Sequence, residues 1–156
     1  MTMAPRVARH LADQKIAHRV VIHAQTPTAS RAAQATHISG NRIAKAVALR
    51  DGDGYVLAVL PASHHVSLDL LQAWLGRPFS LASERDASDL FPDCEVGAIP
   101  PIGQAYGVDV LVDESLFGLD EVCFEGGDHR SLVQIGGEDF ADLMGDAQRG
   151  RFSTHD

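Results

Sequence analysis

The chain has 156 residues, a length typical of one domain, and a formal net charge of −8. No apolar run approaches the roughly 20 residues of a membrane span, and the acidic balance excludes a general nucleic-acid binder, so we expect neither a membrane nor DNA as a partner. Charged residues interrupt the N-terminal segment where a secretory signal would be apolar, and two cysteines suit reduced thiols, so we expect a cytoplasmic protein.

Hydrophobic periodicity and turn residues predict helices and strands along the whole chain. An amphipathic pattern with Val7 and Leu11 inward predicts the first helix, and Asp-Gly-Asp-Gly at 51–54 is a hairpin signal between two apolar strands. In chain order, the expected elements are a helix at 5–14, a strand at 18–23, a helix from 27 to about 36, strands near 43–50 and 54–60, helices at 67–75 and 83–90, strands near 108–113, 121–125 and 131–135, and a helix near 138–144.

Capping residues predict where several of these helices begin and end. A Ser or Thr hydroxyl accepts one of the free N–H groups at a helix start, and glycine readily adopts the left-handed conformation past a helix end. The expected N-caps are Thr26 (with Pro27 as first helical residue), Ser67 and Ser83, and the expected terminators are Ser39 with Gly40, and Gly76.

The charges are unevenly distributed along the chain. Residues 1–50 have a balance of +7, with Asp13 as their only acid, whereas residues 51–156 have a balance of −15. If this difference persists in three dimensions, one face would attract a phosphate backbone and the remainder would repel it. If strands from both parts interleave, the difference disappears. The sequence leaves both alternatives open.

The segment 94–103, Cys-Glu-Val-Gly-Ala-Ile-Pro-Pro-Ile-Gly, is the strongest functional signal. Pro100 and Pro101 remove two backbone donors, so the segment cannot pair inside a sheet, and Pro100 favours extended geometry at Ile99. Gly97 can adopt backbone angles closed to other residues and lets another molecule approach its main chain. The pattern predicts a rigid loop that suits holding a small ligand by backbone groups; a structural turn is the alternative.

Several motifs occur in one order and together resemble a known family. They are Ala-Lys-Ala-Val around Lys45, the strand end Leu-Pro-Ala at 60–62, Cys-Glu-Val at 94–96, Gly-x-x-x-Pro from Gly97 to Pro101, and Gly-Val-Asp-Val-Leu-Val-Asp at 107–113. In this order they resemble the YbaK/EbsC family of aminoacyl-tRNA deacylases, also called the prolyl-tRNA-synthetase-associated or INS-like editing domain. The resemblance covers about residues 5–145.

The resemblance implies an α+β fold, a single domain with a mixed, largely antiparallel, curved sheet surrounded by helices. We expect that domain at 5–145, followed by a flexible C-terminal tail at 146–156. The implied activity is hydrolysis of the ester of a mischarged aminoacyl-tRNA in trans. The implied partners are the acceptor end of the tRNA and, as an open point, an aminoacyl-tRNA synthetase. Neither an organic cofactor nor a metal is implied.

The resemblance also assigns roles to individual residues. Lys45 corresponds to a lysine essential for deacylation, and its ammonium would bind the terminal phosphate or the ester carbonyl. The terminal 2′-hydroxyl of the tRNA would help to activate the attacking water. The loop would position the ester, Arg42 would contact acceptor-end phosphates, and the turn at 125–131 would form the far wall of the pocket. The expected site is therefore Lys45 and Gly97 for catalysis, with Arg42, Ala98, Ile99, Pro100, Pro101, Gly126 and His129 for substrate binding.

Other readings of the chain remain as alternatives. His64 and His65 are adjacent, so in a strand they would point to opposite faces and make poor co-ligands for a metal. Cys94 would serve as a nucleophile only with a base that the sequence does not identify, and a packed thiol is favoured. A non-catalytic module that binds tRNA or a synthetase is the second function considered. The amino acid removed, the tRNA and the oligomeric state are not encoded in any recognisable pattern.

Overall fold

The structure, a computed structural model, describes residues 3–156. Both helices and strands are distributed along this part of the chain. Their order is α1 (Pro5–Asp13), β1 (Arg19–Ile22), α2 (Ala29–Thr36), η1 (Gly40–Arg42), β2 (Ile43–Asp51), β3 (Gly54–Pro61), β4 (His64–Val66), α3 (Leu68–Leu75), β5 (Ser80–Leu81), α4 (Glu84–Leu90), η2 (Gly103–Tyr106), β6 (Asp109–Asp113), η3 (Glu114–Leu116), β7 (Glu121–Glu125), β8 (Ser131–Gly136), α5 (Gly137–Met144), β9 (Gln148–Gly150) and β10 (Ser153–His155), where η marks a short 3-10 helix.

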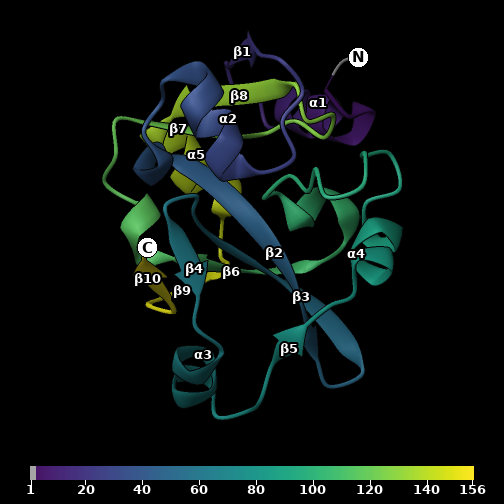
Figure 1. Cartoon of the computed structure of the whole chain (residues 1–156), viewed down its shortest axis with the longest axis vertical. Coiled ribbons are helices and arrows are strands. Elements are labelled where there is room, and N and C mark those ends of the chain that lie inside the picture. Colours follow the sequence, from purple (N-terminus) through teal and green to yellow (C-terminus); the bar gives the residue numbers. More distant parts are fainter. Residues whose placement is uncertain (1–2) are drawn as a thin grey trace.

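One mixed sheet organises the molecule and confirms the predicted α+β class. Its strand order is β1-β8-β7-β2-β3-β6-β9, with β5 beside β2, while β10 and β4 form a separate pair. The β2–β7, β3–β6 and β6–β9 pairs are parallel, and the other pairs are antiparallel. Figure 1 shows the long β2–β3 hairpin running down the molecule, with α3 and β5 at one end and β1, β7 and β8 at the other.

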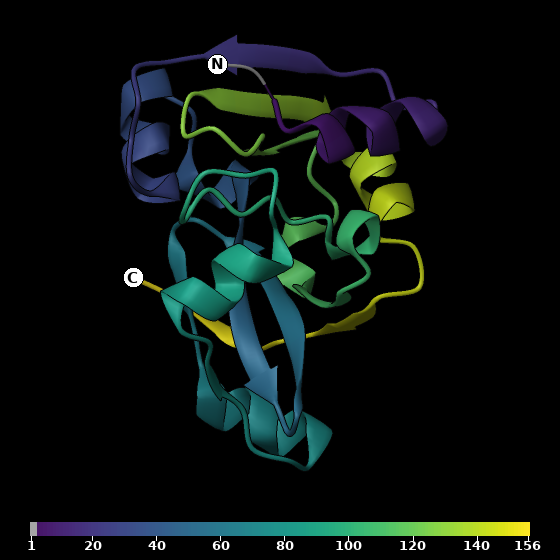
Figure 2. The same ribbon diagram turned by 90° about the vertical axis from the view of Figure 1, so that its right-hand side faces the viewer.

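Helices cover both faces of the sheet where β1, β7 and β8 lie, as Figure 2 shows from the side. On one face, Leu11 of α1 and Phe140 of α5 share a buried cluster with Phe124. On the other face, Ala33 of α2 packs against a cluster that contains Cys123. Because successive strand residues point to opposite faces, neighbouring residues of β7 serve the two different layers.

The predicted caps of α3 and α4 are confirmed. The Ser67 hydroxyl accepts the Leu70 N–H at 3.2 Å, and the Ser83 hydroxyl accepts the Asp86 N–H at 3.0 Å. Gly76 follows α3 with a φ of +74°, a left-handed conformation that glycine adopts without a Cβ penalty.

The predicted start of α2 is wrong by two residues. Thr28, not Thr26, is the N-cap, and its hydroxyl accepts the Arg31 N–H at 3.1 Å. The Thr26 N–H instead donates to the carbonyl of His129 at 3.1 Å, so residue 26 is held against the β7–β8 turn and the helix begins only beyond it. The helix ends at Thr36, as predicted, but His37 in the left-handed conformation terminates it rather than Ser39 with Gly40.

The C-terminal residues form strands, so the prediction of a flexible tail from residue 146 is wrong. β9 pairs with β6, β10 pairs with β4, and Phe152 between them is fully buried with its ring stacked on Trp74. Two three-residue strands are too short for periodicity to reveal. The contacts that hold them come from distant parts of the chain.

Asp113, at the end of β6, anchors this C-terminal segment. One carboxylate oxygen accepts the backbone N–H and hydroxyl of Ser115 at 3.0 and 2.6 Å, and the other accepts the Phe152 N–H and the Ser153 hydroxyl at 3.2 and 2.8 Å. Burial acts to raise the pKa of Asp113, but hydrogen bonds, chiefly those from Ser115, hold it below its ordinary value. This stabilisation is therefore present above the unfolded-state pKa and is lost as the pH falls through the folded-state pKa.

We expect Asp113→Ala to lower the free energy of unfolding by about 3 kcal/mol, because four donors lose a buried acceptor. Chemical denaturation at neutral pH measures the change. The matched control is Asp109→Ala on the same strand, where the side chain is exposed and the expected change is within about 0.5 kcal/mol. Equal effects of the two substitutions would contradict the role of Asp113 as an anchor.

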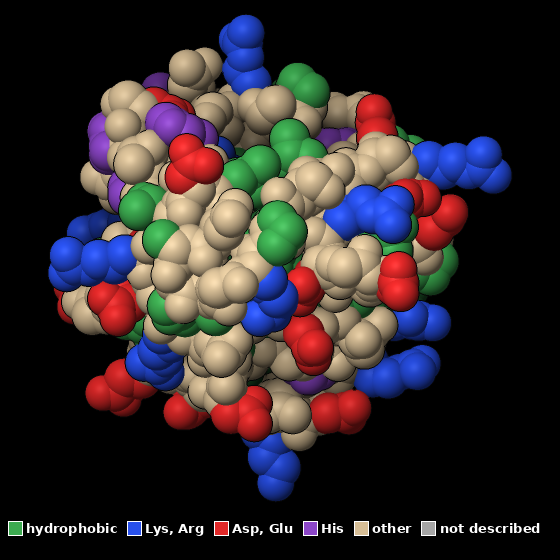
Figure 3. All heavy atoms as spheres, turned by 90° about the horizontal axis from the view of Figure 1, so that it is seen from below, with side chains coloured by type: hydrophobic (Ala, Val, Ile, Leu, Met, Phe, Trp, Pro, Cys, Tyr) green, Lys and Arg blue, Asp and Glu red, His purple; other side chains and the backbone are tan. Residues whose placement is uncertain are grey.

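The fold brings segments of opposite charge balance together. β2, which carries Lys45 and Arg50, lies between β3 and β7, and β7 carries Glu121 and Glu125. Figure 3 shows one face of the molecule, on which Lys and Arg side chains are interspersed with Asp and Glu rather than gathered into one patch. That face therefore offers no continuous basic patch to a phosphate backbone. No helix within residues 3–156 has the length and apolar character needed to cross a membrane.

Candidate functional site

A cavity of about 280 Å³ lies on the α2 face of the sheet, at the place where β2 and β7 part. These two strands pair over only two positions, Ile43 with Cys123 and Ala44 with Phe124. Beyond them the space between the strands is closed by the start of α2, by the 94–103 loop and by the β7–β8 turn. The lining consists of Pro27, Thr28, Ala29, Ala32, Ile43, Ala44, Lys45, Ala46, Val47, Gly97, Ile99, Glu125, His129 and Leu132.

The strand register brings two charged residues to the cavity at the same level. Lys45 lies two residues beyond Ile43, and Glu125 lies two residues beyond Cys123, the parallel partner of Ile43. Because side chains alternate along a strand, all four occupy the same face of the sheet. A cation from β2 and a carboxylate from β7 therefore face a lining that is otherwise mostly apolar.

The glycine loop closes the cavity with exposed backbone. Gly97 is exposed and has a φ of +81°, a conformation that other residues rarely adopt. The loop is fixed against the β7–β8 turn, since the Glu95 N–H donates to the Gly127 carbonyl at 2.8 Å and His129 Nε2 donates to the Val96 carbonyl at 2.7 Å. The 94–103 loop, which was predicted to be rigid, is thus fixed by hydrogen bonds to the β7–β8 turn. This is the turn that was expected to form the opposite wall of the pocket.

Glu125 organises that turn, and the sequence reasoning missed it. Its Oε1 atom accepts the N–H groups of Gly127 and His129 at 3.1 and 2.7 Å, which holds His129 at a φ of +61°. Burial raises the pKa of Glu125, while its backbone hydrogen bonds and His129 act in the opposite direction. The sequence feature that could have identified Glu125 is its position at the end of a predicted strand, directly before Gly126 and Gly127 in the 125–131 turn.

Lys45 crosses the end of β3 instead of projecting freely into the cavity. Its Nζ atom donates to the Ala62 carbonyl at 3.4 Å and to the His64 carbonyl. Burial lowers the pKa of Lys45, and the carboxylate of Asp156 raises it. An ammonium has three donors, so two carbonyl contacts leave one N–H for a ligand.

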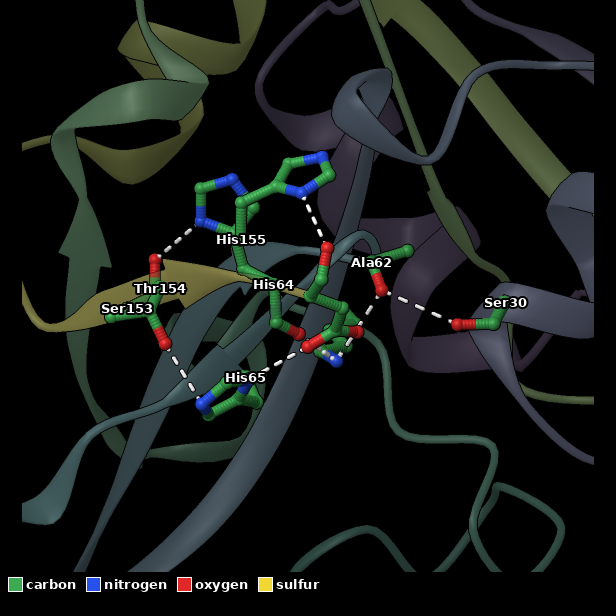
Figure 4. A network of polar contacts seen from close by, with 9 residues as sticks. Ser30, Ala62, His64, His65, Ser153, Thr154 and His155 are labelled. Carbon is green, nitrogen blue, oxygen red and sulfur yellow. Dashed lines mark hydrogen bonds and ion pairs between the residues drawn. The ribbon is translucent and has the colours of Figure 1, made fainter.

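Figure 4 shows the polar network around these two carbonyls. The Ala62 carbonyl also accepts the Ser30 hydroxyl at 3.3 Å, which connects it to α2. The His64 ring contacts the Ser153 hydroxyl at 2.8 Å, and that hydroxyl donates to Asp113. Since β10 pairs with β4, the C-terminal strand fixes the carbonyl that holds Lys45.

The adjacent histidines serve this network. His64 packs edge-on against the His155 ring at 5.3 Å, whereas His65 contacts Asp156 at 2.7 Å. Within residues 3–156, no group of three or more His, Cys, Asp or Glu residues is arranged to hold a metal ion.

The structure brings four of the nine predicted site residues to one cavity, namely Lys45, Gly97, Ile99 and His129. The other five lie outside its lining. Ala98, Pro100 and Pro101 are buried within the loop, and Gly126 is buried within the β7–β8 turn. Arg42 is exposed on η1 and lines a different hollow, with Glu121 and Gln134.

Cys94, the first residue of the loop, is partly buried. Its sulfur lies 3.5 Å from the Tyr106 hydroxyl, which itself donates to Asp93 at 2.6 Å. Burial raises the pKa of the Cys94 thiol to about 12. A thiol that remains protonated at neutral pH is a poor nucleophile, which favours the packing role.

Comparison with solved structures places the fold among proteins of the same architecture. One, provisionally assigned as a trans-editing enzyme for prolyl tRNA synthetase, is 24% identical with a TM-score of 0.81, and the alignment covers 98% of this chain and 99% of the other. A hypothetical protein is 22% identical with a TM-score of 0.84, covering 96% and 99%. A scaffold from a study of computational epitope grafting is 25% identical with a TM-score of 0.82, covering 97% and 96%.

Comparison with sequence families identifies the domain. No curated protein matches the chain. The profile of the aminoacyl-tRNA editing domain, however, matches residues 23–143, a span that includes β2, the glycine loop and the β7–β8 turn. This match confirms the resemblance found in the sequence motifs. The chain belongs to the aminoacyl-tRNA editing domain family.

Proposed function

We propose that this chain is a trans-acting deacylase that hydrolyses the ester of a tRNA mischarged with a small amino acid. The observation that carries the proposal is the cavity that Lys45, Gly97 and His129 line together in a chain of the editing-domain family. The structural neighbour assigned provisionally to trans-editing for prolyl tRNA synthetase supports the free-standing form of this activity.

The chemistry assigned to the cavity is electrostatic. The free N–H of Lys45 would donate to the ester carbonyl oxygen, where negative charge develops as water attacks. The exposed main chain around Gly97 would hold the ester in place. The terminal 2′-hydroxyl of the tRNA would orient the attacking water, so the protein needs no nucleophile of its own.

The size of the cavity favours small substrates. A volume of about 280 Å³ lies just below the usual range for ligand pockets, roughly 300–1,000 Å³. A synthetase gains only about 1–3 kcal/mol of discrimination per methylene, so small side chains are the ones that escape its first selection. A second, smaller site of different shape then removes them.

A non-catalytic tRNA-binding or synthetase-binding module is the second candidate. It is favoured by one specific observation, the engagement of Lys45 Nζ by two backbone carbonyls, which suits a lysine that braces the β3–β4 turn.

The experiment that tests the proposal is a panel of tRNAs charged with Ala, Cys, Ser or Thr, incubated with the protein at fixed ionic strength. We expect faster release of at least one amino acid than without protein, unaffected by chelator or by a thiol-blocking reagent. Binding without release on every substrate would support the module instead. Sensitivity to thiol blocking would indicate Cys94 chemistry.

Arg42 has a role outside the cavity in this proposal. We expect Arg42→Glu to raise the KM for mischarged tRNA by roughly tenfold while changing kcat less, because Arg42 would contact a phosphate and not the ester. Steady-state deacylation at low and high salt measures both constants. Arg85→Glu, an exposed change of the same charge on α4, is the control. An unchanged KM with a collapsed kcat would place Arg42 in the chemistry.

A further inference from the structure

Glu125 has an unused oxygen at the cavity. Oε1 is occupied by the N–H groups of Gly127 and His129, whereas Oε2 has no hydrogen-bond partner among residues 3–156. Among the same residues, His23 Nε2 is the fully buried side-chain polar atom that has no hydrogen-bond partner, and Glu125 Oε2 is not such an atom. Glu125 Oε2 is therefore accessible to solvent. Because Glu125 lines the cavity, we infer that this oxygen faces the cavity.

The cavity lining holds two basic side chains, Lys45 and His129, and each is already engaged by a backbone carbonyl. Lys45 is on the same face of the sheet, but its ammonium is turned toward the Ala62 and His64 carbonyls. His129 Nε2 donates to the Val96 carbonyl, and neither basic side chain donates to Glu125 Oε2. A carboxylate held in a largely apolar cavity is stabilised by a cationic hydrogen-bond donor. Glu125 Oε2 therefore has no such donor among residues 3–156, although Lys45 lies at the same level of the sheet.

An aminoacyl ester supplies such a donor. Its α-ammonium and its carbonyl are attached to the same carbon and diverge from it, so the two groups can contact Glu125 and Lys45 at the same time. With the carbonyl at Lys45, the α-ammonium would approach Glu125; in the reverse orientation two cations would meet at Lys45, which costs energy. On these grounds we propose that Glu125 binds the α-ammonium of the aminoacyl group, so that the site selects tRNA esters with a free α-amino group.

This inference rests on the proposed function for the identity of the ligand but can fail separately from it. It predicts that an ester with an α-hydroxyl in place of the α-ammonium, such as a lactyl group, binds poorly although its shape is nearly the same. Two stable probes isolate the contact: 3′-amino-3′-deoxyadenosine carrying either an alanyl or a lactyl amide. Both retain the 2′-hydroxyl and neither is an ester, so binding is measured without turnover.

We expect the wild-type protein to bind the alanyl probe about 10- to 100-fold more tightly than the lactyl probe, the range for a hydrogen bond to a charged group. Glu125→Gln keeps an oxygen for the two backbone donors and removes the charge at the other position. In this variant we expect the two probes to bind within about twofold of each other. Glu138→Gln, an exposed change on α5, should retain the wild-type preference.

Equal binding of the two probes to the wild-type protein, or binding of neither, would overturn the inference. So would a Glu125→Gln protein that weakens both probes equally. If Glu125→Gln does not fold by circular dichroism, the wild-type comparison still decides. Deacylation of alanyl-tRNA is measured in parallel: preference for the alanyl probe without hydrolysis supports the role of Glu125 and contradicts the deacylase, whereas hydrolysis without preference does the reverse.

Discussion

Lys45→Ala is expected to reduce deacylation by about 10²- to 10³-fold, the usual cost of removing one preorganised donor to a developing oxyanion. Lys45→Met should behave in the same way, because it retains the apolar stem and lacks only the charge. The measurement is single-turnover release of the amino acid from mischarged tRNA. Lys15→Ala, which changes the other lysine of the chain at an exposed position, is the matched control.

The structural role of Lys45 must be separated from its chemical role. Because its Nζ atom also holds two carbonyls at the β3–β4 turn, both variants should melt at a lower temperature than the wild type. Activity is therefore compared well below the lowest melting temperature. A folded Lys45→Met protein with wild-type activity would show that the lysine only braces the turn.

Gly97→Val is expected to reduce activity by at least about 100-fold while leaving the fold intact, the cost of displacing a positioned substrate by about 1 Å. The cause is the backbone: Gly97 has a φ of +81°, which a β-branched residue does not tolerate. A Cβ at this position would lie 3.7 Å from the His129 ring, an ordinary contact, so crowding is not the main cost. Deacylation and circular dichroism are measured together.

Gly118→Val is the matched control for this substitution. Gly118 has a φ of +82° and open space around its Cβ position, so valine imposes the same backbone strain away from the cavity. We expect a loss of stability with activity retained. If both glycine variants lose activity equally, the loss reflects general strain, and the glycine loop is not part of the site.

The elements that sequence predicted well are those set by local chemistry. The Asp51–Gly54 hairpin, the Ser67 and Ser83 caps and the strands near 108–113, 121–125 and 131–135 all depend on neighbours within a few residues. The misplaced start of α2 depends on a hydrogen bond from Thr26 to His129, and the ordered tail depends on Asp113 and Trp74. Such contacts join residues far apart in the chain, so they cannot be predicted from a local sequence pattern.

The same distinction applies to the candidate site. Lys45 and Gly97 were predicted because each stands in a recognisable motif, and the structure brings both to one cavity. Glu125 reaches that cavity only because β7 runs parallel to β2 in one particular register, which the sequence alone does not specify. Arg42 is three residues from Lys45 in the chain but lines another hollow, so proximity in sequence did not mean a shared site.

The most direct test of the proposed deacylase activity is a measurement of the number of turnovers per protein molecule. A limiting amount of the protein is mixed with an excess of tRNA charged with a small amino acid, and the remaining aminoacyl-tRNA is followed over time. The account predicts that each protein molecule releases many amino acids and that Lys45→Met abolishes this release. Charged tRNA that decays only at its spontaneous rate, while a binding assay shows it bound to the wild-type protein, would contradict the proposal that this chain is a deacylase.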